Sequence, residues 1–287
     1  MAPRVSTYMS SPVYVVRPND NLAYARNLML KKGISRLVVV NEVEKPVGII
    51  TTTDIVETMY GSNFYKPLDR VYVSDVMTKE LITIEENKSL RTAAHLMVKH
   101  KIGGLPVVNS EGKLVGIITR SDIARAYGEK YKGLYHASEV MRTDFPKASP
   151  THSIYYILKL MESSVIRKVV IVDENDKVMG IVAKKDVAFA YTPAALLSAR
   201  GKDRFVKSKV VDPLKDKIVP LRNYLVPVAE DIMTKDVITS GPEEDSAAIA
   251  KSMYDEGIGS IPIVDSERRV LGLVTKLDIV QLAMKIF

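Results

Sequence analysis

Four stretches of this chain repeat one pattern of apolar and polar positions. Each opens at a glycine, continues with two aliphatic residues and ends at an aspartate, at residues 48–54, 116–122, 180–186 and 272–278. Short β-branched runs predict buried strands, and a polar residue directly after such a run is typical of a helix start. A methionine stands 39 residues before each glycine, at Met9, Met77, Met141 and Met233. Equal spacing without insertions indicates a true internal repeat.

The residues between these landmarks predict an extended stretch, a helix, two strands and a second helix in every copy. In the second copy we expect the first strand at residues 81–84 and a helix beginning at Asn87 or Ser89. Its apolar positions, Leu90, Ala93, Ala94 and Met97, follow the spacing of a helix packed on one side. Equivalent helices carry Met29, Met161 and Met253. We interpret these methionines as core residues, with a methionine-lined cofactor site as the less favoured alternative.

One such unit, about 55 residues long, leaves one face of a small sheet bare, so copies are expected to pair by their sheets. We place the copies at residues 5–60, 71–127, 135–191 and 228–287. Consecutive signature aspartates are 68, 64 and 92 residues apart, so the extra length lies in residues 192–227. This connector is basic and proline-containing. It is interpreted as a solvated excursion, with a nucleic-acid-binding arm as the alternative, because no groove-reading motif accompanies it.

Composition excludes several classes of protein. The 287 residues are 46% hydrophobic and 26% charged, an ordinary globular balance, and no apolar run approaches the roughly 20 residues of a membrane span. The absence of cysteine excludes disulfides and thiolate chemistry, and it suits a cytoplasmic location. Four histidines without a ligand motif predict no metal site. The net charge of +7 favours anionic partners such as phosphates, nucleic acid or an acidic protein surface.

The signature stretch can hold an anion or a sugar. A strand that delivers Thr51, Thr119 or Thr275 to a helix start offers a hydroxyl and free backbone N–H groups to a phosphate. The aspartate three residues later repels phosphate but can accept hydrogen bonds from two ribose hydroxyls. Threonine and aspartate are also ordinary N-cap and first-turn residues. At this point both interpretations stay open.

The Met-Thr lead-in, the run Ile-Gly-Gly-Leu-Pro-Val-Val at 102–108 and the run Gly-Ile-Ile-Thr-Arg-Ser-Asp-Ile at 116–123 resemble the cystathionine β-synthase (CBS) domain. Four copies cover almost the whole chain outside the connector. The resemblance implies an α+β fold of βαββα units, paired one with two and three with four into two Bateman modules. As in the similar γ subunit of AMP-activated protein kinase, the modules would form a flat disc with clefts toward its centre.

The resemblance also implies four clefts, which we name by their aspartates. In the Asp54 cleft, Thr51 and Asp54 face Thr83, Ile102, Gly103 and Gly104, whose glycines leave backbone open to a base. In the Asp122 cleft, Thr119 and Asp122 face Val15, Ile34, Ser35 and Arg36. In the Asp278 cleft, Thr275 and Asp278 face Lys147, Ile166, Arg167 and Lys168. In the Asp186 cleft, Asp186 faces Thr239, Ile258, Gly259 and Ser260.

Two departures from the family pattern weaken some clefts. Ala183 replaces the signature threonine before Asp186, and Val15 and Lys147 stand where the other copies have threonine. We therefore expect two good clefts and two doubtful ones. Arg36, Arg167 and Lys168 are expected to contact phosphate, whereas Lys184 and Lys276 are left open between phosphate contact and solvation.

The leading hypothesis is a non-catalytic, energy-sensing regulatory protein that binds AMP, ADP or ATP, with S-adenosylmethionine or NAD less favoured. It would signal through a regulated protein partner or a homodimer. The alternative is a nucleic-acid-binding or scaffold protein that uses the basic surface. Enzymatic activity is disfavoured, because the sequence carries no glycine-rich nucleotide loop and no nucleophile motif.

Overall fold

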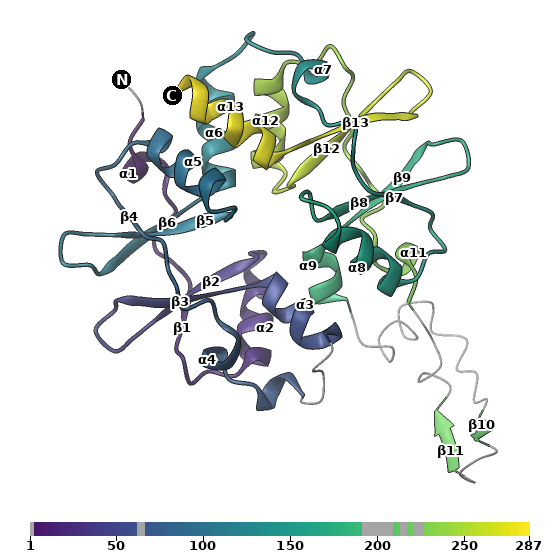
Figure 1. Cartoon of the computed structure of the whole chain (residues 1–287), viewed down its shortest axis with the longest axis horizontal. Helices are drawn as coiled ribbons and strands as arrows, with labels where there is room; N and C mark the ends of the chain where they lie inside the picture. The colour runs from purple at the N-terminus through teal and green to yellow at the C-terminus, as the bar shows by residue number, and fades with distance from the viewer. Residues whose placement is uncertain (1–2, 62–66, 191–208, 213–216, 221–226) are drawn as a thin grey trace.

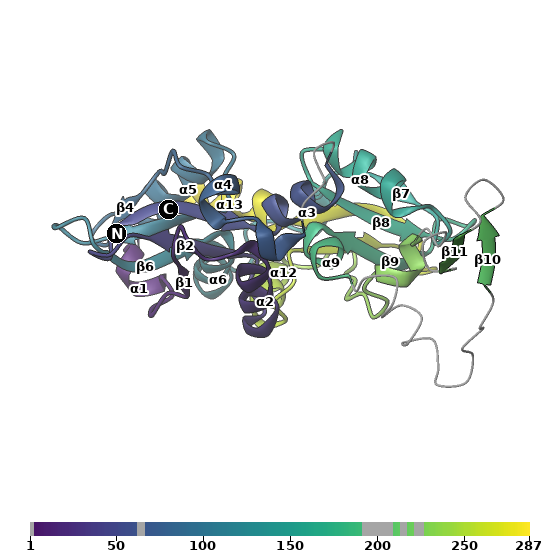
Figure 2. The same cartoon turned by 90° about the horizontal axis from the view of Figure 1, so that it is seen from below.

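The computed structural model describes the chain except for residues 1–2, 62–66, 191–208, 213–216 and 221–226. The connector predicted at 192–227 falls largely outside the described residues. Within it the structure describes only the backbone of an antiparallel pair, β10 (Lys209–Asp212) and β11 (Lys217–Pro220). The rest of the chain forms a flat disc, with the first two repeats on one side and the last two on the other (Figures 1 and 2).

The first module contains repeats one and two. Repeat one comprises α1 (Val5–Tyr8), β1 (Val15–Val16), α2 (Leu22–Lys32), β2 (Arg36–Val40), β3 (Pro46–Thr51) and α3 (Thr52–Tyr60). A 3₁₀ turn, η1 (Leu68–Arg70), leads into repeat two. Repeat two comprises α4 (Val73–Val76), β4 (Ile84–Glu85), α5 (Leu90–Lys99), β5 (Gly104–Val108), β6 (Leu114–Thr119) and α6 (Arg120–Lys130).

The second module contains repeats three and four. Repeat three comprises α7 (Ala137–Val140), β7 (Lys147–Ala148), α8 (Ile154–Glu162), β8 (Lys168–Val172), β9 (Val178–Ala183) and α9 (Lys184–Phe189). Repeat four comprises α11 (Ala229–Ile232), α12 (Ser246–Asp255), β12 (Ser260–Val264), β13 (Val270–Thr275) and α13 (Lys276–Ile286). A single parallel bridge from Ser240 to Ile263 takes the place of its first strand.

The predicted order of elements is confirmed in the second repeat. Strand β4 is shorter than expected and starts at Ile84, whereas α5 begins after Ser89, whose side chain accepts a hydrogen bond from the Thr92 N–H. Strands β5 and β6 are antiparallel, and β4 lies parallel to β5. The methionine at the equivalent position of each first long helix is fully buried, which confirms the interpretation as core: Met29, Met97, Met161 and Met253.

Repeats pair within each module by exchanging their lead-in segments. The Ser10 N–H donates to the Ile117 carbonyl of repeat two at 2.9 Å, and the Thr78 N–H donates to the Ile49 carbonyl of repeat one at 3.0 Å. Apolar residues of the paired sheets, including Val38, Val40 and Ile117, pack between the two repeats. Repeats three and four pair in the same way, which confirms the two predicted modules.

The lead-in methionines pack on the signature glycines, where a larger residue would clash. A Cβ atom placed on Gly272 would lie 2.5 Å from Met141 Sδ, and Gly180 meets Met233 in the same way. Equivalent contacts join Gly48 to Met77 and Gly116 to Met9. The methionine and the glycine therefore recur in every repeat because each methionine packs on the glycine of the paired repeat, and their constant spacing reflects the length of the repeat.

Replacing Gly272 with alanine is expected to lower the free energy of unfolding by about 1–3 kcal/mol, because the added methyl group overlaps the Met141 thioether. Gly241→Ala is the matched control, since nothing lies within 4 Å of a Cβ at Gly241. Thermal or denaturant unfolding of both variants measures the difference. Equal stability of the two variants would contradict this account of the glycines.

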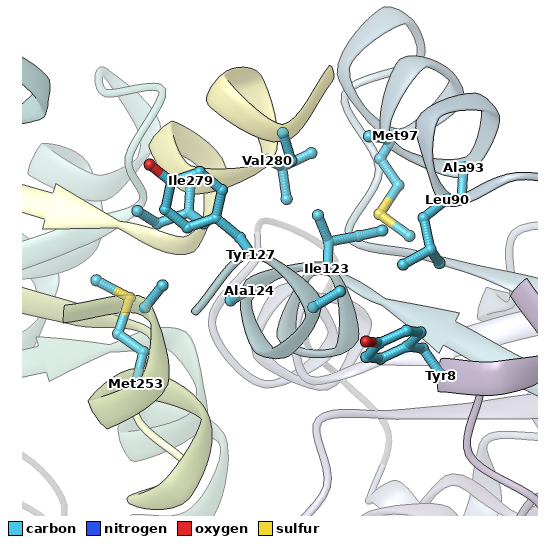
Figure 3. Close-up of a cluster of buried hydrophobic side chains, with 14 of the residues drawn as sticks. Tyr8, Leu90, Ala93, Met97, Ile123, Ala124, Tyr127, Met253, Ile279 and Val280 are labelled. Carbon is cyan, nitrogen blue, oxygen red and sulfur yellow. The ribbon is translucent and has the colours of Figure 1, made fainter. Parts of the chain in front are cut away.

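The two modules join through helices, with repeat two against four and repeat one against three. Helix α6 packs on α12 and α13, and α3 packs on α9. Figure 3 shows the larger contact, where Ala124 and Tyr127 of α6 lie toward Met253 of α12 and Ile279 of α13, and Ile123 of α6 lies between Val280 of α13 and Leu90 of α5. The Tyr127 hydroxyl is paired with Ser246 Oγ at 2.9 Å, so this buried polar group is satisfied. Among the described residues, no helix is both long and apolar enough to cross a membrane.

Candidate functional site

All four repeats line one central cavity of about 1850 Å³. The ends of the signature strands, the starts of the helices that follow them and the lead-in segments all contribute to its wall. Within the described part of the chain, no group of three histidine or acidic side chains could hold a metal ion. The lining instead combines carboxylates, hydroxyls, glycine backbone and a large number of cations.

Every signature aspartate caps its own helix with one carboxylate oxygen. Oδ2 of Asp54 accepts from the Thr51 N–H at 2.7 Å and from the Thr51 hydroxyl at 2.8 Å, and Asp122 does the same with Thr119. Asp186 accepts only from the Ala183 N–H, because Ala183 has no hydroxyl. The capping interpretation is therefore correct for Oδ2 in every copy.

The second oxygen, Oδ1, distinguishes three of the aspartates from the fourth. Among the described residues, Oδ1 of Asp54, Asp122 and Asp186 accepts no hydrogen bond from another residue. All three side chains line the cavity, and burial raises the pKa of each, against the lowering effect of the capping hydrogen bonds. These three carboxylates combine a helix cap with a free acceptor, which is the arrangement that a sugar hydroxyl needs.

Asp278 differs because Arg142 occupies its second oxygen. Arg142 Nε donates to Asp278 Oδ1, and Arg142 Nη2 lies 3.3 Å from Gln281 Oε1. Asp278 is 6% exposed and does not line the cavity. The sequence predicted a ligand cleft at Asp278, whereas the structure fills that acceptor position with a guanidinium.

Four partly buried cations, one from each repeat, define what we call the cation cluster: Arg36, Arg120, Lys168 and Lys276. Burial, together with smaller contributions from neighbouring positive charges, lowers the pKa of Lys168 to about 7 and that of Lys276 to about 8, while Asp186 and Asp122 respectively oppose this lowering. The pKa of Arg36 falls to about 10 for the same two reasons, and that of Arg120 also falls. The lowered pKa values reflect cations that are removed from water and that repel one another at close range.

The carboxylates near the cation cluster, Asp122, Asp186 and Asp278, compensate its charge only in part, because each raises the pKa of a cluster member less than burial lowers it. Among the residues that the structure describes, none of its members forms an ion pair with a carboxylate. Lys276 Nζ donates to Ser121 Oγ at 2.7 Å, and Arg120 Nη2 donates to the Ile102 carbonyl at 3.0 Å. Arg120 Nε is buried and has no hydrogen-bond partner in the described part of the chain. Unpaired buried charge is costly, so such an arrangement favours an anion as its partner.

Two of the cations lie against glycines of the paired repeat. A Cβ on Gly103 would lie 2.6 Å from Arg36 Nη2, and a Cβ on Gly259 would lie 2.5 Å from Lys168 Nζ. The predicted open backbone at Gly103 and Gly104 is therefore covered by the Arg36 guanidinium in this structure. Arg167 adds a further cation at the cavity wall and has a left-handed φ of 51°, which is unusual outside glycine.

Most of the predicted site residues meet at the cavity. Those that line it are Ile34, Ser35, Arg36, Thr51, Asp54, Ile102, Gly103, Gly104, Thr119, Asp122, Ile166, Arg167, Lys168, Lys184, Asp186, Ile258, Gly259, Ser260, Thr275 and Lys276. Those that do not line it are Val15, Thr83, Lys147, Thr239 and Asp278. Lys147 instead points to the neighbouring turn, where its Nζ lies 3.1 Å from Asp176 Oδ1.

Sequence reasoning missed several lining residues. Tyr14, Ile82 and Ile238 line the cavity, each one position before the predicted Val15, Thr83 and Thr239. Because side chains of an extended chain alternate between faces, a choice displaced by one residue selects the wrong face. The apolar character of Ile82 and Ile238 at a repeated position was the available signal.

The family comparison agrees with this architecture. A family model of the CBS domain matches residues 5–61, 73–129, 137–192 and 228–285. The chain belongs to the CBS domain family. The four matched CBS domains account for most of the chain, and the stretch without a match between the third and the fourth contains most of the predicted connector.

Similar proteins share this four-domain organisation. The uncharacterized protein MJ1225 of Methanocaldococcus jannaschii is 26% identical in an alignment 281 residues long that covers 94% of this chain and 94% of that protein. Its crystal structure, described as that of a proposed archaeal homolog of γ-AMPK, superposes with a TM-score of 0.80 over 97% of this chain and 99% of that one. An uncharacterized conserved protein from Pyrococcus horikoshii is 22% identical and gives a TM-score of 0.63 over 98% and 99% of the chains. This second likeness concerns the fold alone.

Proposed function

We propose that this protein is a non-catalytic regulatory protein that binds AMP, ADP or ATP in its central cavity. The observation that carries the proposal is the cation cluster, in which four partly buried cations form no ion pair with a carboxylate among the described residues, and Arg120 Nε has no hydrogen-bond partner there. A phosphate chain supplies the missing negative charge and several hydrogen-bond acceptors at once. Family resemblance supports adenosine as the remainder of the ligand.

In this proposal, the ribose hydroxyls donate hydrogen bonds to the free Oδ1 atoms of Asp54, Asp122 and Asp186. Each carboxylate lines the cavity that also contains the cation cluster, so one ligand can contact both. The Thr51 and Thr119 hydroxyls orient Oδ2 and leave Oδ1 toward the ligand. Ala183 removes that support from Asp186, so we rank the Asp186 cleft below the other two.

Regulation in this proposal follows from the position of the cluster between the modules. Arg36 and Arg120 belong to the first module, whereas Lys168 and Lys276 belong to the second. Direct contacts already cross the boundary, from Lys276 Nζ to Ser121 Oγ and from Lys184 Nζ to Glu57 Oε1 at 3.5 Å. A ligand that bridges both sets of cations favours one arrangement of the modules over another. A partner protein or a second copy of the chain would detect that difference.

Asp54→Asn is expected to weaken nucleotide binding at the Asp54 cleft by about 10- to 100-fold, because a charged acceptor for ribose is lost while the helix cap keeps an acceptor oxygen. Calorimetric titration of the full chain with AMP, ADP, ATP, NADH and S-adenosylmethionine measures the change and the ligand preference. Asp75→Asn is the matched control, since Asp75 caps α4 in the same way and does not line the cavity. Equal effects of both substitutions would contradict the ribose role, and flat titrations with all five compounds would contradict the proposed function.

A further inference from the structure

One lead-in position differs sharply among the four repeats. Ser10, Thr78, Arg142 and Thr234 each follow the lead-in methionine. Each forms a bridge with the signature strand of the paired repeat, to Ile117, Ile49, Leu273 and Ile181 respectively. The four backbone positions are therefore equivalent, and three of them carry a short hydroxyl side chain. Only the arginine of repeat three is long enough to reach the aspartate across the cleft.

Arg142 and the helix cap together use both oxygens of Asp278. Oδ2 accepts from the Thr275 N–H at 2.8 Å and from the Thr275 hydroxyl at 2.6 Å, while Oδ1 accepts from Arg142 Nε. A second nitrogen of the same guanidinium, Nη2, reaches Gln281 Oε1 on the next turn of α13. Arg142 Nε thus donates to the oxygen that a sugar hydroxyl would use in the other clefts, and the contact of Nη2 with Gln281 holds the guanidinium there.

We infer that Arg142 closes the Asp278 cleft, so that the chain has at most three working nucleotide clefts. This inference rests on the proposed function for the meaning of an open cleft. A nucleotide would have to displace a charge-assisted hydrogen bond from the Asp278 carboxylate, and it would leave the Arg142 guanidinium without that partner. Asp54, Asp122 and Asp186 require no such displacement, because Ser10, Thr78 and Thr234 do not reach them.

Four other residues of the predicted Asp278 cleft line the cavity, Ile166, Arg167, Lys168 and Thr275, whereas Lys147 does not. The acceptor oxygen of Asp278 is the part that Arg142 takes away. Shortening Arg142 to the threonine of repeats two and four therefore restores the arrangement of the open clefts. Threonine is the replacement residue because Thr78 and Thr234 occupy the equivalent position in repeats two and four.

The first test uses the full chain with Asp278→Asn and Asp54→Asn, titrated with ATP in the calorimeter. Asp278→Asn is expected to leave the number of bound nucleotides and their affinities unchanged, whereas Asp54→Asn weakens one site. Loss of a bound nucleotide in Asp278→Asn would overturn the inference while the proposed function stood. This comparison requires no change at Arg142 and remains informative if an Arg142 variant fails to fold.

The second test is Arg142→Thr, checked for folding by circular dichroism and titrated with ATP. The stoichiometry is expected to rise by one, and adding Asp278→Asn is expected to remove that extra site. A folded Arg142→Thr variant with unchanged stoichiometry would overturn the inference. If the unchanged protein bound no nucleotide, the proposed function would fail, but a site gained in Arg142→Thr would still support closure by Arg142.

Discussion

Replacing Lys168 and Lys276 together with methionine is expected to weaken ATP binding by more than about 100-fold. Each lysine offers charge-assisted hydrogen bonds to phosphate, worth about 1.5–3 kcal/mol apiece. The same double variant is expected to be more stable than the unchanged protein in the absence of ligand, by roughly 1–4 kcal/mol near neutral pH. The reason is that the substitutions remove from the cavity two desolvated lysines that form no ion pair among the described residues.

The double variant is expected to bind ATP more weakly and to be more stable, and this pair of opposite effects is specific to the role proposed for the cation cluster. Calorimetry with ATP measures the first effect, and denaturant unfolding without ligand measures the second. Lys99→Met with Lys132→Met is the matched control, because both lysines are exposed and neither lines the cavity. A double Lys168 and Lys276 variant that bound ATP normally, or that lost stability, would contradict the role assigned to the cation cluster.

Nucleotide affinity is expected to fall as pH rises from about 7 to about 9. The pKa of Lys168 is about 7 and that of Lys276 about 8 in the free protein, so both lose their protons in this window. Phosphate prefers the protonated lysines and raises their pKa on binding, so the complex takes up protons. Since the phosphate group itself is already fully charged above its own pKa of about 6, its titration does not explain the trend.

The measurement is calorimetry at pH 8 in two buffers with different ionisation enthalpies. The observed binding enthalpies are expected to differ in the direction of proton uptake, by about one proton per ligand on the cluster. In the absence of ligand, the free energy of unfolding changes with pH in the direction opposite to that of the nucleotide affinity. Unfolded Lys168 keeps its proton up to about pH 10.4, so the unfolded chain binds more protons between about pH 7 and 10, and the free energy of unfolding rises with pH there. Proton release on binding would contradict this account.

The sequence predicted the fold closely, because its signals are local and repeated four times. The recurrence of a methionine and a glycine at fixed places in each repeat reports the packing of Met141 on Gly272 and its three equivalents. The buried faces of the helices follow from 3.6-residue periodicity, as the fully buried Leu90, Ala93 and Met97 show. The pairing of repeats into modules followed from the family resemblance and from the bare sheet face of a single unit.

The site was less predictable, because its decisive contacts join repeats that are distant in sequence. Local pattern placed Asp278 with Asp54, and only the three-dimensional structure brings Arg142, 136 positions earlier, onto its carboxylate. The Arg36 guanidinium likewise covers the Gly103 backbone from another repeat. Neither contact leaves a periodic trace in the sequence.

Register explains the remaining misplaced residues. Thr83 and Thr239 were predicted as site residues because they place hydroxyls at a repeated position, whereas Ile82 and Ile238 line the cavity. Lys147 shows the same effect, since its side chain points away from the cavity to Asp176. Residue chemistry alone does not identify the inward face of a short extended segment, because one step along the chain reverses it.

The most direct test of the central claim is a crystal structure of the full chain grown with ATP or AMP. The account predicts phosphate oxygens within hydrogen-bond distance of Lys168 Nζ, Lys276 Nζ or the Arg36 and Arg120 guanidinium groups, with ribose hydroxyls on Oδ1 of Asp54 or Asp122. A nucleotide bound elsewhere, or a cavity in which those carboxylates only cap their helices at saturating ligand, would contradict it.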